Sequence, residues 1–165
     1  MFSDGYVMVQ QARTVFWLWE KLWDYNPKCV ERFAEGLDCH FKDNKPDEYT
    51  RHANIEIKER LPREGSSCDF PRHGGFYIID WSFAYIKTGR KDFLQQVHRM
   101  LDYWWPRRSE TGMLPLESRT PENAEGRYNK SSPGQAASLG MSLLETAAMF
   151  DEKDPVLAAT MRERL

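Results

Sequence analysis

The chain has 165 residues, of which 41% are hydrophobic and 13% aromatic, and its formal net charge is −2. This composition supports a folded domain with a core and excludes an intrinsically disordered chain. The near-neutral charge gives no electrostatic basis for nucleic-acid binding, and no apolar run is long enough to span a bilayer, so we expect neither partner.

The first residues show no secretion signal. The compartment therefore stays open: cytoplasmic, or secreted or periplasmic if a signal precedes this chain. The three cysteines lack the spacing of metal ligands, and we interpret them as buried or reduced structural thiols.

Apolar residues at helical spacing predict a first pair of helices. Residues 6–25 are apolar around most of the helix circumference, which is typical of a buried helix. Asn26-Pro27 then reads as an N-cap followed by proline at the first helical position, opening a second helix over about 27–41. A polar connector, 42–74, follows.

The stretch that follows, Asp69 to Trp81, combines a shaped loop with the start of a helix. Gly74-Gly75 allows a positive φ or a close approach of the backbone to another group, so we predict a loop over 69–75 and a helix over about 75–87. Gly89 is expected to end this helix in the left-handed conformation.

The remaining helices follow the same order. A helix over about 91–105 carries an apolar stripe, and a second polar connector spans 107–131. Ser132-Pro133 is expected to begin the next helix. Asp154-Pro155 is again an N-cap residue followed by proline at the first helical position, and it is expected to begin the last helix.

The second helix of each pair starts near Pro27, Lys91 and Pro155, which are 64 residues apart each time. Equal spacing of one unit indicates a repeat, and short links within each pair force antiparallel neighbours. The sequence therefore predicts an all-α fold of three αα-hairpins, at about 6–41, 75–106 and 132–165, in one domain spanning 1–165. We expect the hairpins to form part of a ring, with the long connectors at one mouth.

These hairpins resemble the (α/α) toroid of carbohydrate-active proteins, which includes six-hairpin glycosidases, polysaccharide lyases and N-acylglucosamine 2-epimerase-like enzymes. Phe70 to Tyr77, Tyr85 to Leu94 and Thr111 to Pro115 resemble bacterial pectate-lyase-like toroids, and Gln10 to Phe16 resembles an inner helix of the sugar epimerases. Such toroids have about six hairpins, so the resemblance implies that this chain is about half of one, a fragment.

The resemblance implies an oligo- or polysaccharide substrate and, as first choice, a lyase that acts on uronate glycans by proton abstraction and β-elimination. His73 or His52 would be the base, Arg72 or Arg119 would neutralise the carboxylate, and Tyr77 would be the acid. Arg127 is a further candidate for the carboxylate. Trp81 and Tyr128, with Tyr77, would stack on sugar rings.

Three alternatives stay open. A glycoside hydrolase would need two carboxylates, with Asp80, Glu117 and Glu56 as candidates. An epimerase would need two facing bases, and a helical-repeat glycan- or peptide-binding module would need none. Each residue also has a structural interpretation: Trp81 as core, the arginines as solvated charges, Asp80 as a hydrogen-bonded structural carboxylate. No compact cluster of metal ligands is visible, so we predict no metal or cofactor, with calcium bridging a uronate as the alternative.

Overall fold

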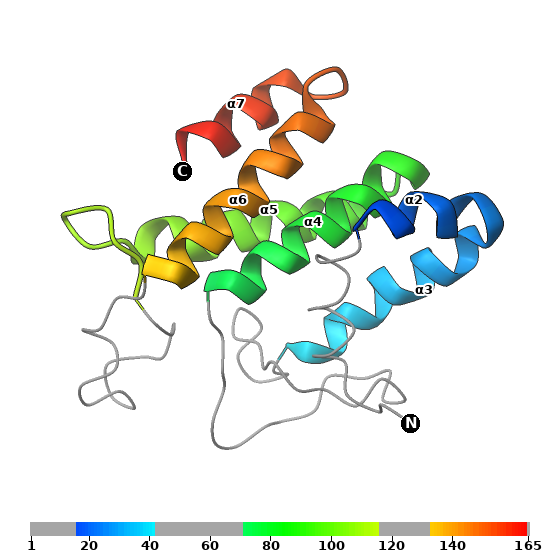
Figure 1. Cartoon of the computed structure of the whole chain (residues 1–165), viewed down its shortest axis with the longest axis horizontal. Helices are drawn as coiled ribbons and strands as arrows, with labels where there is room; N and C mark the ends of the chain where they lie inside the picture. Colours follow the sequence, from blue (N-terminus) through cyan, green and yellow to red (C-terminus); the bar gives the residue numbers. More distant parts are fainter. Residues whose placement is uncertain (1–15, 42–70, 116–132, 165) are drawn as a thin grey trace. The chain divides into compact units, whose positions relative to one another are not determined.

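The computed structural model describes residues 16–41, 71–115 and 133–164, and the chain divides into two compact units, Met1–Cys68 and Asp69–Leu165. All regular elements in the described ranges are helices, and these ranges contain no β-strand (Figure 1). The predicted all-α class is therefore confirmed, whereas the predicted single domain stays a prediction. None of the described helices has the length and apolarity required to cross a membrane.

The first unit contains one helical hairpin. Helix α2 (Phe16–Tyr25) is followed by α3 (Pro27–Gly36) and a 3₁₀ turn, η1 (Leu37–His40). Contact between the Trp19 and Phe33 rings, whose centroids are 4.7 Å apart, joins the two helices. Asn26 occupies the N-cap position as predicted, but its side chain makes no capping hydrogen bond.

The second unit contains two further hairpins. Its elements are α4 (Pro71–Thr88), α5 (Lys91–Trp104), the 3₁₀ turn η2 (Trp105–Arg107), α6 (Pro133–Phe150) and α7 (Pro155–Glu163). Gly89, with φ +73°, ends α4 as predicted, and its N–H donates to the Tyr85 carbonyl at 2.7 Å. Asp154 caps α7 by accepting from the Leu157 N–H at 3.0 Å.

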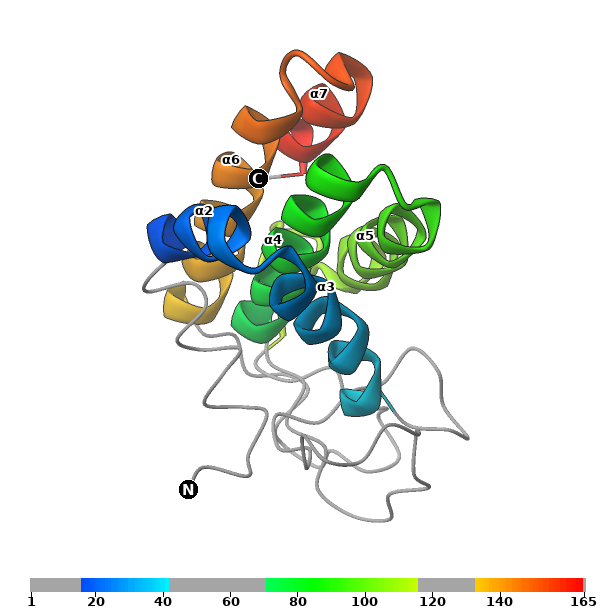
Figure 2. The same cartoon turned by 90° about the vertical axis from the view of Figure 1, so that its right-hand side faces the viewer.

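The predicted repeat is confirmed, because α3, α5 and α7 begin at Pro27, Lys91 and Pro155. The long helices α4 and α6 run side by side in the same direction, since Gly75 lies against Leu139 near their starts and the Tyr85 ring stacks on Phe150 near their ends. Figure 2 shows α4 between α6 and α5. Two parallel first helices, each followed by an antiparallel second helix, are the arrangement expected of a helical toroid.

The predicted loop over 69–75 is wrong within the described residues, because α4 already begins at Pro71. Neither Gly74 nor Gly75 has a positive φ, and both are helical. Gly75 instead permits a close approach: a Cβ there would lie 2.6 Å from the Ser142 Oγ and 2.8 Å from the Ser142 Cβ. Gly75 therefore serves helix packing, the second of the two roles expected for the glycine pair.

Candidate functional site on helix α4

Helix α4 carries every predicted site residue that the structure describes. His73, Tyr77 and Asp80 follow each other at intervals of four and three residues, so the helical period of 3.6 places them on one face. Gly75 and Ser82 lie on the opposite face, and Gly75 contacts α6 there. We call His73, Tyr77 and Asp80 the α4 triad. Its side chains are buried, with exposures of 1%, 1% and 6%.

Asp80 has the most unusual environment of these residues. Its Oδ2 is buried and has no hydrogen-bond partner among the described residues. Burial raises the pKa of the Asp80 carboxyl well above its usual range, because a buried carboxylate loses its hydration. The acid therefore holds its proton at pH values where an ordinary aspartate has released it. Such a group is a proton donor, which is a frequent property of catalytic acids.

Aromatic rings and an arginine surround this face of α4. The Tyr77 and Trp81 rings stack with centroids 5.4 Å apart, and Trp81 is 1% exposed, which agrees with its structural interpretation as a core residue. The His73 ring lies 5.9 Å from Phe76. Arg72 is half-buried, and its Nε has no partner in the described part of the chain. A carboxylate is the acceptor that such a guanidinium binds best.

The other predicted site residues lie outside the described ranges, so nothing tests their placement: His52, Glu117, Arg119, Arg127 and Tyr128, with Glu56 of the hydrolase alternative. Within the described residues, no three His, Cys, Asp or Glu side chains are grouped closely enough to hold a metal ion. The role of calcium stays a prediction.

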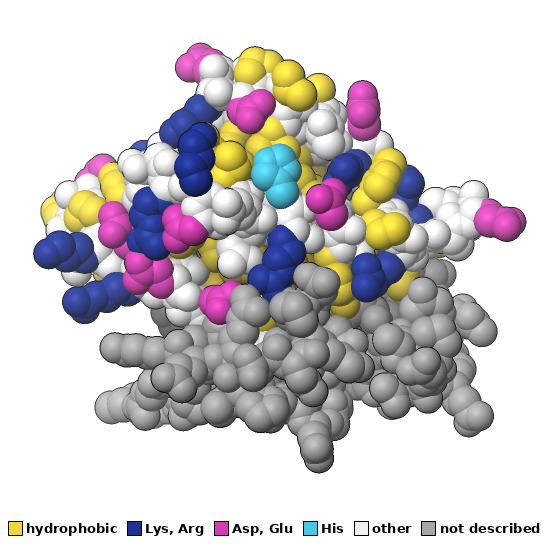
Figure 3. Space-filling view, turned by 180° about the vertical axis from the view of Figure 1, so that it is seen from behind, with side chains coloured by type: hydrophobic (Ala, Val, Ile, Leu, Met, Phe, Trp, Pro, Cys, Tyr) yellow, Lys and Arg dark blue, Asp and Glu magenta, His cyan; other side chains and the backbone are white. Residues whose placement is uncertain are grey.

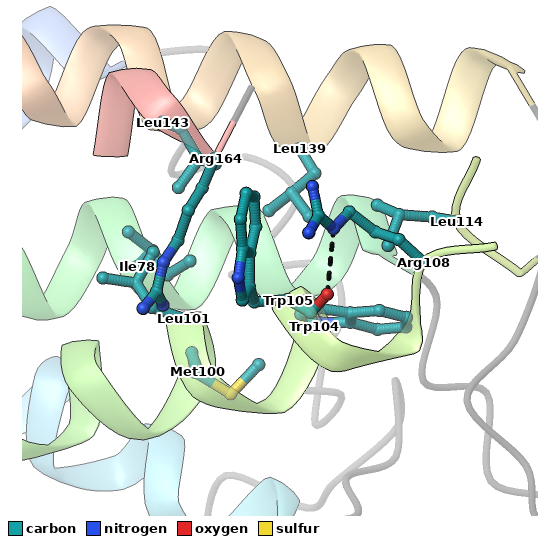
Figure 4. Close-up of a pocket in the computed structure, with 10 residues that line it drawn as sticks. All are labelled: Ile78, Met100, Leu101, Trp104, Trp105, Arg108, Leu114, Leu139, Leu143 and Arg164. Carbon is teal, nitrogen blue, oxygen red and sulfur yellow. Dashed lines mark hydrogen bonds between the residues drawn. The ribbon is translucent and has the colours of Figure 1, made fainter. Parts of the chain in front are cut away.

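A pocket that the sequence did not indicate lies between α4, α5, α6 and the end of α7 (Figure 4). Its empty volume is about 290 Å³, including the part open to solvent. The wall is apolar apart from two arginines and consists of Ile78, Met100, Leu101, Trp104, Trp105, Arg108, Leu114, Leu139, Leu143 and Arg164. Arg108 and Arg164 are 56 positions apart in the sequence, and no pattern links them.

Comparison with known proteins gives a structural likeness only. No protein-family model matches the chain, and no curated protein matches it either. The crystal structure of an unsaturated glucuronyl hydrolase from Bacillus sp. GL1, responsible for the degradation of glycosaminoglycan, superposes with a TM-score of 0.55 at 18% identity, over 87% of this chain. The fold is that of part of an (α/α) toroid. This chain covers 42% of that hydrolase, which is less than half its length.

A second structure, an Asp-to-Asn variant of such a hydrolase with dGlcA-Glc-Rha-Glc, has a TM-score of 0.44 at 21% identity and covers 72% of this chain and 33% of its own. The likeness to the first structure supports the expected toroid fold, and that structure is a hydrolase and not a pectate-lyase-like protein.

Proposed function

We propose that the chain is part of a carbohydrate-active enzyme that hydrolyses uronate-containing glycans, with Asp80 as the general acid. The observation that carries this proposal is the buried Asp80 carboxyl, whose raised pKa and unpartnered Oδ2 keep a proton available on α4. The toroid neighbour is a glucuronyl hydrolase, which supports a uronate substrate.

Glycoside hydrolysis requires a proton on the leaving oxygen as the bond to the sugar breaks. In this proposal Asp80 donates that proton, and the carboxylate that remains is reprotonated from water after the product leaves. A second carboxylate must activate water or attack the sugar, and Glu117 and Glu56 are its candidates. Arg72 would hold the uronate carboxylate by charge-assisted hydrogen bonds.

β-Elimination is the second candidate, because His73 and Tyr77 lie one turn apart on the same face of α4. His73 would remove the proton α to the uronate carboxylate, the carbon–oxygen bond would break, and Tyr77 would protonate the departing oxygen. This leaves a carbon–carbon double bond in the product and consumes no water. The two candidates therefore differ in their products.

The test uses the full reading frame that contains this chain. Intact uronate polysaccharides and unsaturated uronyl oligosaccharides are each incubated with the protein, and products are followed by reducing ends, ultraviolet absorbance and mass spectrometry. Hydrolysis adds one water to the products, whereas elimination adds none and raises the absorbance. The variants are Asp80→Asn and His73→Ala, with Asp92→Asn on α5 as the control, since Asp92 is exposed and lies outside the α4 triad.

Hydrolysis would be supported by products that carry one added water molecule, if Asp80→Asn no longer forms them and Asp92→Asn still does. Unsaturated products that disappear in His73→Ala would replace it with the elimination mechanism. Saturable glycan binding with no turnover by any variant would contradict both mechanisms and favour a binding module.

A further inference from the structure

Helix α6 has an apolar face that nothing in the described part of the chain covers. Of its 18 residues only Glu145 is charged, and a helix of this composition is normally buried on all sides. Met141 and Leu144 are nevertheless 48% and 44% exposed, and Ala137 and Ala148 are exposed as well. An exposed apolar patch of this kind marks a surface that packs against a partner.

The four apolar residues form one stripe on the side of α6 that points away from α4. Their spacing of four, three and four positions is that of an a/d seam, along which two helices pack. Leu139 and Ser142 lie on the opposite side of α6, where they are buried against Gly75 of α4. We call the exposed stripe the α6 seam: Ala137, Met141, Leu144 and Ala148.

The α6 seam repeats the surface through which α4 contacts α6. Both helices have 18 residues, and their first residues are 62 positions apart (133 − 71). Gly75 contacts α6, and Ser82 lies on the same face of α4 seven positions later. The residues 62 positions after these two are Ala137 and Leu144 of the seam. The established α4–α6 interface therefore has a counterpart on the free side of α6, which suits the packing of another first helix.

The other described surfaces do not offer such a face. Seen from behind, the chain carries Lys and Arg side chains that alternate with Asp and Glu (Figure 3). Helix α4 is buried at 14 of its 18 residues, so it cannot pack against a further helix. On α2 the exposed side chains include Glu20, Lys21 and Asp24, and an apolar partner would desolvate these charges. A second copy of the chain would therefore meet the seam with its own α6.

We propose that the α6 seam binds a second copy of this chain, in a two-fold dimer whose α6 helices run antiparallel. Such an interface is isologous, so its surface must be complementary to itself. With the two-fold axis midway between positions 142 and 143, Met141 faces Leu144 of the partner, and Ala137 faces Ala148 of the partner. The large side chains meet at the centre, and the small alanines at both ends let the helices approach closely.

Charge favours the antiparallel over the parallel arrangement. Antiparallel pairing places Glu145 opposite Gly140 of the partner, so the two Glu145 residues are about 7.5 Å apart along the helix axis. Parallel pairing would place them at the same height, where like charges repel most strongly. Antiparallel pairing also brings the positive start of each helix beside the negative end of the other.

The test measures the oligomeric state of the full chain by sedimentation equilibrium. One helix per partner buries less than the roughly 800 Å² of a standard interface, so the concentration range extends to about 300 µM. The variants are Met141→Lys, Leu144→Glu and the double variant that carries both. Val156→Lys is the matched control, because Val156 is 77% exposed but lies on α7, outside the seam. Circular dichroism compares the helix content of each variant with the parent.

We expect the parent to dimerise, and each single seam variant should raise the dissociation constant by about tenfold or more, whereas Val156→Lys leaves it unchanged. The double variant should dimerise about fivefold or more tightly than either single variant, because antiparallel pairing sets each introduced ammonium against an introduced carboxylate. A monomeric parent at about 300 µM, equal weakening by Val156→Lys, or a double variant no tighter than the single ones would overturn the proposal.

The same measurement on the full reading frame that contains this chain decides between a second copy and another occupant of the seam. A dimer that the seam variants dissociate would support the proposal. A monomer would mean that a further segment of the same protein covers the seam, and it would overturn the proposal. The concentration dependence of the parent decides the matter even where a variant fails to fold.

Discussion

Replacement of Asp80 by asparagine should make the fold more stable, and the gain should grow as the pH rises. Asp80 is 6% exposed, and burial raises the pKa of its carboxyl. In the unfolded chain the same group titrates near its usual value of about 3.9. Between the unfolded and the folded pKa, the folded protein holds a proton that the unfolded chain has released.

The sign of the effect follows from this difference in bound protons. Stability of the parent falls as the pH rises through that window, by up to about 1.4 kcal/mol for each pH unit, and levels off above the folded pKa. Below the unfolded pKa both states are protonated and the loss disappears. Asparagine does not titrate, so Asp80→Asn lacks this loss while keeping nearly the same shape.

Urea unfolding at successive pH values from 4 to 8 measures the effect as the difference in unfolding free energy between Asp80→Asn and the parent. The account predicts a small difference at pH 4 that increases as the pH rises. A difference that is independent of pH, or that decreases as the pH rises, would refute the assignment of a buried, protonated carboxyl at position 80.

Four further predictions concern the same unfolding measurement. Asp92→Asn should show the opposite trend to Asp80→Asn, because hydrogen bonds from Arg90, at 2.5 and 3.1 Å, lower the Asp92 pKa. The small loss of stability in Asp92→Asn should be present at neutral pH and vanish as the pH falls through the folded-state pKa of Asp92. A loss that persists in acid would contradict this prediction. Gly75→Ala should lower the free energy of unfolding by about 1–3 kcal/mol because the new Cβ would meet Ser142, whereas Gly36→Ala, with no atom within 4 Å of the new Cβ, should not lower it. Adding Ser142→Gly to Gly75→Ala should restore part of the loss. Additive effects in the double mutant would exclude this contact as the cause. Asp154→Ala should cost about 1 kcal/mol by removing the cap of α7, and Asn26→Ala much less, since its side chain makes no capping bond; equal costs would contradict the cap geometry. Gly89→Ala should destabilise by about 1 kcal/mol because the residue has φ +73°, and an unchanged midpoint in urea would argue against that conformation.

The fold follows from local signals that act over a few residues. Proline after a capping residue fixes the starts of α3 and α7, and Gly89 fixes the end of α4, because these residues restrict or permit backbone angles regardless of their surroundings. Their regular spacing then predicts the repeat. The loop predicted at Gly74-Gly75 is wrong because glycine at position 75 serves a contact with Ser142, which lies 67 residues further along the chain.

The candidate site was predicted only in part, because local signals place its residues on one helix face but do not show their burial. Asp80 stands out in the sequence because it interrupts an apolar helix, and helical spacing alone places it with His73 and Tyr77. The burial of its carboxyl depends on tertiary packing, so the direction of its pKa shift required the structure. Arg108 and Arg164 meet at Trp105 only through the packing of separate hairpins, which no spacing in the sequence reveals.

The most direct test of Asp80 as a general acid compares two leaving groups in the full reading frame that contains this chain. The rate of Asp80→Asn relative to the parent is measured on a uronyl oligosaccharide and on a nitrophenyl uronide, whose leaving group departs without a proton. The account predicts a loss of about 10²–10⁴-fold on the oligosaccharide and a much smaller loss on the nitrophenyl substrate. Equal losses on both substrates would contradict proton donation by Asp80.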